Sequence, residues 1–162
     1  MRLLVAAVGR KDPFAEATRD YLDRASATGR PLGLTGPTLH AVEAPRATSG
    51  AVRQAREAAL LSGALPDGAR LVLLDEGGKD ATSRDVARLV AREREAGTPS
   101  LAFLIGGADG FAEGFAEARR PRVAGTIAFG RATWPHMLVR LMLAEQLYRA
   151  TTILTNHPYH RD

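Results

Sequence analysis

The sequence predicts a single α/β domain with a mainly parallel β-sheet and helices on both faces of the sheet. Short apolar runs alternate with longer segments that carry apolar and charged residues at helical spacing, and strands that alternate with helices are typical of parallel sheets. The chain has 162 residues, which is enough for one ordinary core, and no repeat or low-complexity linker divides it. Residues 1–162 are therefore expected to form one domain.

The first half of the chain contains two expected strands and two expected helices. Residues 3–8 are a short apolar run that predicts the first strand, and Asp12-Pro13 is a start signal for a helix over about residues 14–27. Residues 26–38 are rich in Gly, Pro and Thr and predict a loop, followed by a strand in "LHAVEA". The segment "VRQAREAALL" then predicts a helix over about residues 49–62.

The second half continues the same alternation. We expect a buried strand in "ARLVLLDE", a helix over residues 84–96, a strand in "SLAFLIGG", a short helix near residues 111–118 and a strand in "GTIAFG". A long last helix begins at Pro135, a residue that suits the first turn. Its segment "PHMLVRLMLAEQLYRA" has almost no polar face, so it must be buried on more than one side. The second cover is either the protein's own core or another subunit.

The amino-acid composition excludes several kinds of functional site. Cysteine is absent, which excludes disulfides, thiolate metal sites and cysteine nucleophiles. The formal net charge is +4, and only Lys11 and Lys79 are lysines among 22 Lys and Arg residues. Arginine suits phosphate, so a nucleic-acid partner is one interpretation and solvated helix faces are the other. No segment reaches the length of a membrane span, which fits a cytoplasmic protein without a membrane partner.

Three predicted strands end in segments that can approach a ligand. "LIGGADGF" places Gly106, Gly107 and Gly110 between a strand and the next expected helix. Its spacing is neither that of a dinucleotide-binding motif nor that of a P-loop, which argues against a nicotinamide-dependent enzyme. "LLDEGGK" and "IAFGRATW" supply two more such ends. Because the carboxyl ends of parallel strands meet at one edge of a sheet, the three ends could frame one pocket, although each alone could be an ordinary turn.

The C-terminal segment "NHPYHR" gathers two histidines, a tyrosine and an arginine. Pro158 separates the histidines and no further ligand completes a zinc set, so no metal site is expected. Histidine titrates near neutral pH, tyrosine can donate or accept a hydrogen bond, and arginine can stabilise an anion. The segment is thus either a source of acid–base groups or a frayed end.

Four stretches, "LLDEGGK", "LIGGADGF", "ATWPHMLVRLMLAEQLYRA" and "NHPYHR", resemble in this order the bacterial ribosomal RNA large-subunit methyltransferase H family. That family is the small, single-domain branch of the SPOUT methyltransferases. The resemblance implies a C-terminal trefoil knot and a homodimer. It also implies transfer of a methyl group from S-adenosylmethionine to N3 of a pseudouridine in 23S rRNA, on assembled ribosomes. A ribosome-associated binding protein with the same fold and no methyl transfer is the alternative.

The resemblance implies the cofactor contacts, and the chemistry of the acceptor nitrogen suggests roles for further residues. Tyr159, His160 and Arg161 are the expected catalytic residues, with His160 as the proton acceptor and Arg161 as the anion stabiliser. Arg140 and His157 are the expected substrate contacts, and the alternative for Arg140 is an ion pair with Glu145 or hydrogen bonds to backbone carbonyls. The expected cofactor contacts are Leu74, Gly106, Gly107, Phe129, Gly130, Arg131, Ala132, Thr133 and Trp134.

Overall fold

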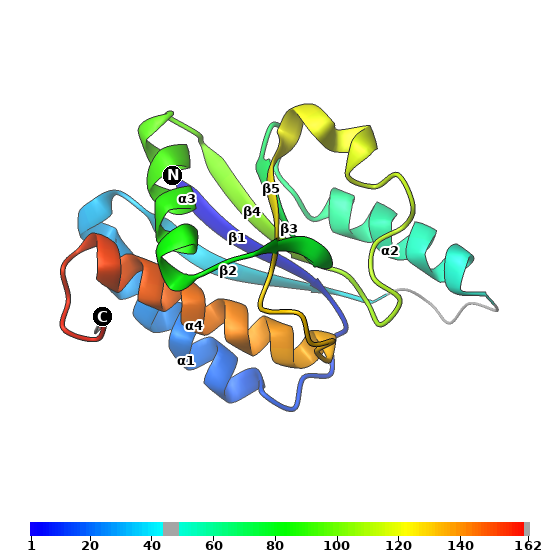
Figure 1. Ribbon diagram of the computed structural model, residues 1–162, viewed down its shortest axis with the longest axis horizontal. Coiled ribbons are helices and arrows are strands. Elements are labelled where there is room, and N and C mark those ends of the chain that lie inside the picture. The colour runs from blue at the N-terminus through cyan, green and yellow to red at the C-terminus, as the bar shows by residue number, and fades with distance from the viewer. Residues whose placement is uncertain (44–48, 161–162) are drawn as a thin grey trace.

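The protein, seen in a computed structural model that describes residues 1–43 and 49–160, is built on a parallel sheet. The strands are β1 (Arg2–Val8), β2 (Thr35–Val42), β3 (Arg70–Asp80), β4 (Ser100–Ile105) and β5 (Val123–Ala128). The α-helices are α1 (Ala15–Gly29), α2 (Gly50–Gly63), α3 (Ser83–Glu95) and α4 (His136–Leu154), and two 3-10 helices are η1 (Arg30–Leu32) and η2 (Glu117–Arg122). Figure 1 shows their arrangement.

The sheet has five strands in the order β2-β1-β4-β3-β5, and every pair of neighbours is parallel. This confirms the predicted α/β fold class. All strands therefore end at one edge of the sheet, which we call the carboxyl edge, and begin at the other, which we call the amino edge. The loops that follow β4 and β5 share the carboxyl edge, as the sequence predicted, whereas "LLDEGGK" is not a turn, because β3 continues to Asp80 after its pairing with β4 stops at Leu74.

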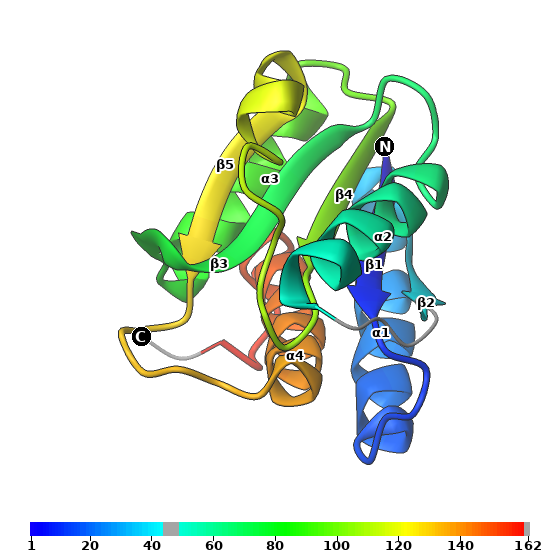
Figure 2. The same ribbon diagram turned by 90° about the vertical axis from the view of Figure 1, so that its right-hand side faces the viewer.

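Helices cover both faces of the sheet, because successive side chains of a strand point to opposite faces. Leu3 and Val5 of β1 pack in a core with buried residues of α1, α3 and α4. Leu4 and Ala6 belong to a second core, in which Leu61 of α2 is buried. The helices α1, α3 and α4 thus lie on one face and α2 lies on the other (Figures 1 and 2).

Two further local predictions were wrong. Residues 26–38 are not one long loop, because α1 continues to Gly29, η1 follows directly and β2 begins at Thr35. Gly33 ends η1 with a φ of 72°, a conformation that favours glycine, so this Gly-rich stretch turns within a few residues. No helix forms over residues 111–116. Gly114 has a φ of 71°, and the helical turns begin only in η2. Ala44, the last residue of the predicted "LHAVEA" strand, lies outside the described residues.

The helix α4 is buried largely by its own chain. Leu143, Ala144 and Leu147 are inaccessible in the core that α4 shares with α1 and α3. Leu141 and Met142 are only half-buried and line a groove with Phe129. The protein's own core therefore accounts for most of the apolar character of α4 but leaves part of one face accessible. The trefoil knot remains a prediction.

None of the helices in the described parts of the chain is long and apolar enough to cross a membrane.

Candidate functional site

A cavity of about 380 Å³ opens at the carboxyl edge of the sheet. Its wall combines Leu74, where the pairing of β3 with β4 stops, the end of β4 at Ile105 and Gly106, and the end of β5 at Ala128. The first turn of α4 closes the cavity with His136 and Val139. A volume of this size is within the range of small-molecule sites.

The structure brings nearly all of the predicted cofactor contacts to this cavity. The residues that line it are Leu74, Gly106, Gly107, Phe129, Gly130, Ala132, Thr133 and Trp134. Arg131 does not line it and is exposed. The three strand ends that the sequence singled out therefore share one cavity.

Hydrogen bonds of side chains fold the loops around the cavity. The Trp134 indole Nε1 donates to the Phe129 carbonyl at 3.0 Å, which closes residues 129–134 into a compact turn. The Thr133 hydroxyl donates to Glu76 Oε2 at 3.1 Å and joins the loop after β5 to the end region of β3. The Gly77 amide donates to Asp75 Oδ1 at 2.9 Å. The wall thus presents the carboxyl-bearing residues Asp75 and Glu76 beside apolar residues.

The glycine loop after β4 is packed too tightly for larger residues. A Cβ atom at Gly106 would lie 2.9 Å from the Gly110 carbonyl carbon and 3.0 Å from its oxygen. Gly107 and Gly110 form an isolated bridge, and Gly110 has a φ of 72°. Glycine is required here because the loop folds back on itself, and its backbone then lines the cavity.

The helix α2 holds the glycine loop from outside, through three side chains that we call the α2 clamp: Arg53, Gln54 and Glu57. Arg53 Nε donates to Asp109 Oδ2 at 2.7 Å, and Gln54 Nε2 donates to the Asp109 carbonyl at 2.6 Å. Gln54 also donates to the Phe111 carbonyl at 3.2 Å. The Gly107 amide donates to the Glu57 carboxylate. Both ends of the loop are therefore tied to one helix.

Glu57 is 6% exposed. Burial raises its pKa, against the opposing effect of the Arg53 charge and the Gly107 amide. Sequence reasoning missed the α2 clamp, because "VRQARE" looks like any exposed helical segment. Its polar residues at positions 53, 54 and 57 share one helical face, which was the available signal.

His136 was also missed as a residue of the site. It lies in the first turn of α4 and lines the cavity. Burial lowers its pKa, and the nearby Arg140 charge lowers it further. A neutral imidazole is therefore favoured at the cavity wall at neutral pH.

Arg140, which was predicted to contact the substrate, lies in the interior of the chain. The residue is 1% exposed. Its Nη1 donates to Asp12 Oδ2 at 3.2 Å, and its Nη2 donates to the carbonyls of Val8 at 2.9 Å and Gly9 at 2.7 Å. Position on a helix could not reveal that Arg140 faces the end of β1 instead of solvent.

The described part of the C-terminal segment is ordered against α4 and does not fray. The Tyr159 hydroxyl donates to Glu145 Oε1 at 3.1 Å, and its ring lies 4.5 Å from that of Tyr148 between centroids. The Arg149 guanidinium lies 4.9 Å from the Tyr159 ring centroid. Burial, with further effects of Tyr21 and Glu145, raises the pKa of Tyr159 to about 12.

The other predicted residues of this segment differ in their surroundings. His157 is exposed, and its Nδ1 accepts a hydrogen bond from the Tyr159 amide at 3.2 Å. His160 is half-buried. Arg161 lies outside the described residues. The exposed His157 can thus reach a partner, whereas Tyr159 is held by α4.

The start of α4, which lines the cavity, and the C-terminal segment lie at opposite ends of this helix (Figure 1). The helix has 19 residues, which corresponds to about 28 Å at about 1.5 Å per residue. His136 of the first turn lines the cavity, while Tyr159 packs on Tyr148 and Arg149 near the last turn. One chain in this conformation does not bring Tyr159 and His160 to the predicted cofactor contacts.

Comparison with known proteins identifies the family. A family described as "Predicted SPOUT methyltransferase" matches residues 1–160 of the chain. The chain belongs to the SPOUT methyltransferase family. This confirms the resemblance stated from the four sequence motifs.

Curated relatives of this SPOUT chain are similar over their whole length. A protein of Paracoccus denitrificans named ribosomal RNA large subunit methyltransferase H is 50% identical, over 100% of both chains. Proteins of the same name are 49% identical in Xanthobacter autotrophicus, over 99% of both chains, and 46% identical in Methylocella silvestris, over 100% of both chains. The similarity therefore includes the cavity loops and the C-terminal segment.

Proposed function

We propose that this protein uses S-adenosylmethionine to methylate N3 of a pseudouridine in the 23S rRNA of assembled ribosomes, and that it does so as a homodimer in the cytoplasm. The observation that carries the proposal is the cavity at the carboxyl edge, where three strand ends of a SPOUT fold meet. The names of the full-length relatives supply the class of acceptor.

The cavity wall fits the chemistry of S-adenosylmethionine. Leu74, Ile105 and Val139 give apolar surface for a purine ring. Asp75 and Glu76 place carboxyl groups where a cationic ligand can be accommodated, and the glycine loop offers backbone groups at close range. When bound, S-adenosylmethionine supplies an electrophilic methyl group on a sulfonium centre. The protein's part is to hold donor and acceptor in line, which makes positioning the main catalytic requirement.

The acceptor nitrogen requires a proton acceptor. An imide nitrogen carries a proton and becomes a nucleophile only as that proton leaves, with negative charge spreading to the flanking carbonyl oxygens. In our proposal the His160 imidazole takes this proton, Arg161 stabilises the developing anion, and Tyr159 helps to orient the base. His157, which is exposed, contacts the RNA.

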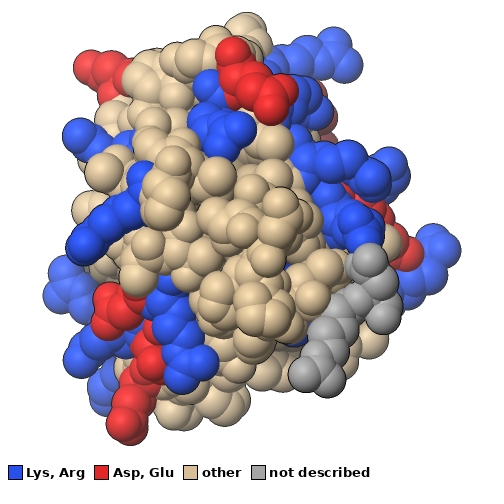
Figure 3. Space-filling view, turned by 90° about the vertical axis from the view of Figure 1, so that its left-hand side faces the viewer, with Lys and Arg blue, Asp and Glu red and all other residues tan. Residues whose placement is uncertain are grey.

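A homodimer would reconcile these roles with the geometry. Because α4 separates its own cavity from its own C-terminal segment, the catalytic residues of one chain would act at the cavity of the second chain. Leu141 and Met142 leave part of α4 accessible for such a contact. Figure 3 shows the face at the C-terminal end of α4, where uncharged residues fill the centre and Lys and Arg side chains, with some Asp and Glu among them, border it. An uncharged centre suits a second subunit, and a basic border suits phosphate.

The test is transfer of labelled methyl from S-adenosylmethionine to assembled ribosomes that lack the modification, with free 23S rRNA alongside and the product mapped by mass spectrometry. We expect label on one pseudouridine of ribosomes and none on free rRNA. Binding of both ribosomes and S-adenosylmethionine without transfer would contradict the proposal and would favour a binding protein that kept the fold.

A further inference from the structure

The loop that follows β1, residues 9–12, lies beside the cavity. Gly9 has a φ of 97°, and its amide donates to the Val42 carbonyl of β2 at 2.7 Å. A Cβ atom at Gly9 would lie 3.4 Å from His136 Nε2, and His136 lines the cavity. The loop therefore packs against the first turn of α4 at the carboxyl edge.

A buried ion pair fixes this loop at its far end. The side chains of Arg140 and Asp12 are 1% and 3% exposed. Asp12 Oδ2 accepts from Arg140, and its Oδ1 accepts from the Phe14 amide at the start of α1, at 2.8 Å. Arg140 also binds the carbonyls of Val8 and Gly9. Both ends of the loop are thus tied to α4.

The anchored loop also carries two cations, Arg10 and Lys11. Arg10 and Lys11 are exposed, and within the described part of the chain neither forms an ion pair or a side-chain hydrogen bond. The adjacent Asp12 does not neutralise them, because its carboxylate is committed to Arg140 and to the start of α1. Two positive side chains are therefore presented to solvent from the loop that packs against the first turn of α4, and Arg10 lines a separate groove that also contains Asp23.

We infer that Arg10 and Lys11 bind phosphate groups of the RNA on either side of the target nucleotide, and that the Arg140–Asp12 pair is a positioning pair that holds them there. This inference rests on the proposed function, since it assumes an RNA acceptor. Phosphate contacts of this kind fix the register of an RNA without reading its sequence. They place the substrate base at the mouth of the cavity. Arg140 thereby acts on the substrate through the loop and not by contact.

The test compares two double variants of equal charge change. Arg10→Ala/Lys11→Ala removes the proposed contacts. Arg30→Ala/Arg120→Ala is the control, because both arginines are exposed in the 3-10 helices that precede β2 and β5, at the amino edge. Ribosome binding is measured against salt concentration, together with the KM for ribosomes and the Kd for S-adenosylmethionine. We expect about a 10-fold weaker ribosome affinity for the first variant, and a salt slope that is shallower by about 1.5.

The Kd for S-adenosylmethionine is expected to stay within twofold, which separates substrate contact from damage to the cavity. Equal effects of the two double variants on ribosome binding would overturn the contact, because only net charge would then matter. If the wild-type protein binds ribosomes but transfers no methyl, the proposed function fails while the binding comparison still decides the contact.

Positioning is tested with Asp12→Asn/Arg140→Met, which removes both buried charges at once and so avoids leaving one of them unpaired. The variant keeps Arg10 and Lys11. We expect its KM for ribosomes to rise as in Arg10→Ala/Lys11→Ala, with a near-native circular dichroism spectrum and an unchanged Kd for S-adenosylmethionine. A folded variant with a wild-type KM would overturn the positioning role. Asp12→Asn alone provides a second variant if the double one does not fold.

Discussion

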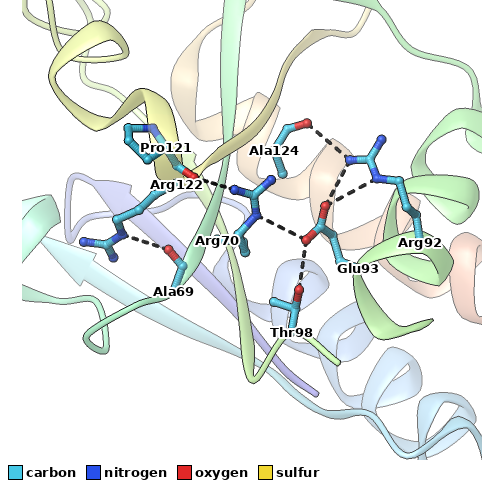
Figure 4. Close-up of polar contacts among 8 residues, drawn as sticks. All are labelled: Ala69, Arg70, Arg92, Glu93, Thr98, Pro121, Arg122 and Ala124. Atoms are coloured by element: carbon cyan, nitrogen blue, oxygen red, sulfur yellow. Dashed lines mark hydrogen bonds and ion pairs between the residues drawn. The ribbon is translucent and has the colours of Figure 1, made fainter. Parts of the chain in front are cut away.

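The two edges of the sheet are built from similar residues but are organised in opposite ways. At the amino edge, Glu93 has a side chain that is 6% exposed and is surrounded by donors. Arg70 Nε approaches it at 3.3 Å, Arg92 Nη2 at 3.0 Å and the Thr98 hydroxyl at 3.0 Å (Figure 4). Arg70 and Arg122 also bind backbone carbonyls, of Pro121 and Ala69. These polar groups of the amino edge bind one another or the backbone.

The carboxyl edge keeps its binding groups available. Its glycine loop lines a cavity of about 380 Å³, and Arg10 and Lys11 are exposed on the loop that packs against the first turn of α4. The comparison teaches that a high arginine content does not by itself show which arginines contact RNA. Arg70, Arg92 and Arg122 stabilise the fold through internal contacts, whereas cations without internal partners at the other edge are the ones suited to phosphate.

The largest effect on turnover is expected when a group that is proposed to act at the carboxyl edge is removed. His160→Ala should lower kcat at least about 100-fold, because a positioned proton acceptor contributes about 100- to 10,000-fold. Ribosome and S-adenosylmethionine binding should stay near wild type. His40→Ala is the control, since His40 is exposed on β2 away from α4. A His160→Ala enzyme with full turnover would remove His160 from the mechanism.

A substitution at the amino edge should lower the stability of the protein and leave its turnover unchanged. Glu93→Gln leaves Arg70 and Arg92 without their counter-charge, and we expect the free energy of unfolding in urea to fall by about 2 kcal/mol. The kcat of the folded fraction should stay within twofold. A large loss of kcat with unchanged stability would show that the amino edge takes part in the reaction, contrary to the contrast between the edges.

The α2 clamp makes internal contacts, as the amino edge does, but it holds a loop that lines the cavity. Arg53→Ala removes the ion pair with Asp109 and should weaken S-adenosylmethionine binding about 5-fold, because the glycine loop loses one of its ties. Arg53→Lys should restore part of the affinity, and the KM for ribosomes should not change. An Arg53→Ala variant that binds the cofactor as wild type does would show that the loop holds its shape without α2.

The smallest expected effect is a difference in pH dependence between two buried glutamates. Burial raises the pKa of Glu57, so its contribution to stability is present at low pH and is lost as pH rises through the raised pKa. Burial also raises the pKa of Glu93, but bonds from Thr98 and Arg92 and the charge of Arg70 outweigh it. The net lowering means that stability is present above the ordinary glutamate pKa and is lost as pH falls.

Urea unfolding between pH 3 and pH 8, a range chosen to span roughly the ordinary glutamate pKa, measures both effects. In wild type, ionised Glu93 makes stability fall as the pH is lowered, and Glu93→Gln should abolish this part of the fall. Ionisation of Glu57 makes stability fall as the pH is raised, and Glu57→Gln should abolish that part of the fall. The same sign for both variants would contradict the opposite environments of the two carboxyl groups.

The cavity was predictable because it depends on a topological rule. Once strands and helices alternate, the ends of β3, β4 and β5 must meet at one edge, and this placed Leu74, Gly106 and Phe129 together. The burial of Arg140 and the role of Glu57 were not predictable in this way. Both depend on how a helix is rotated against its neighbours, which periodicity does not give for α4, a helix that is apolar nearly all round, and which α2 indicates only through one shared polar face.

Binding of S-adenosylmethionine by isothermal titration calorimetry tests the central claim most directly, with two glycine substitutions. Gly106→Ala places a Cβ atom 2.9 Å from the Gly110 backbone and must deform the cavity wall, whereas a Cβ at Gly63 meets nothing within 4 Å. The account predicts that wild type and Gly63→Ala bind equally and that Gly106→Ala binds more than about 10-fold more weakly. Equal binding by Gly106→Ala, or no binding by wild type, would contradict the assignment of the carboxyl edge as the methyl-donor site.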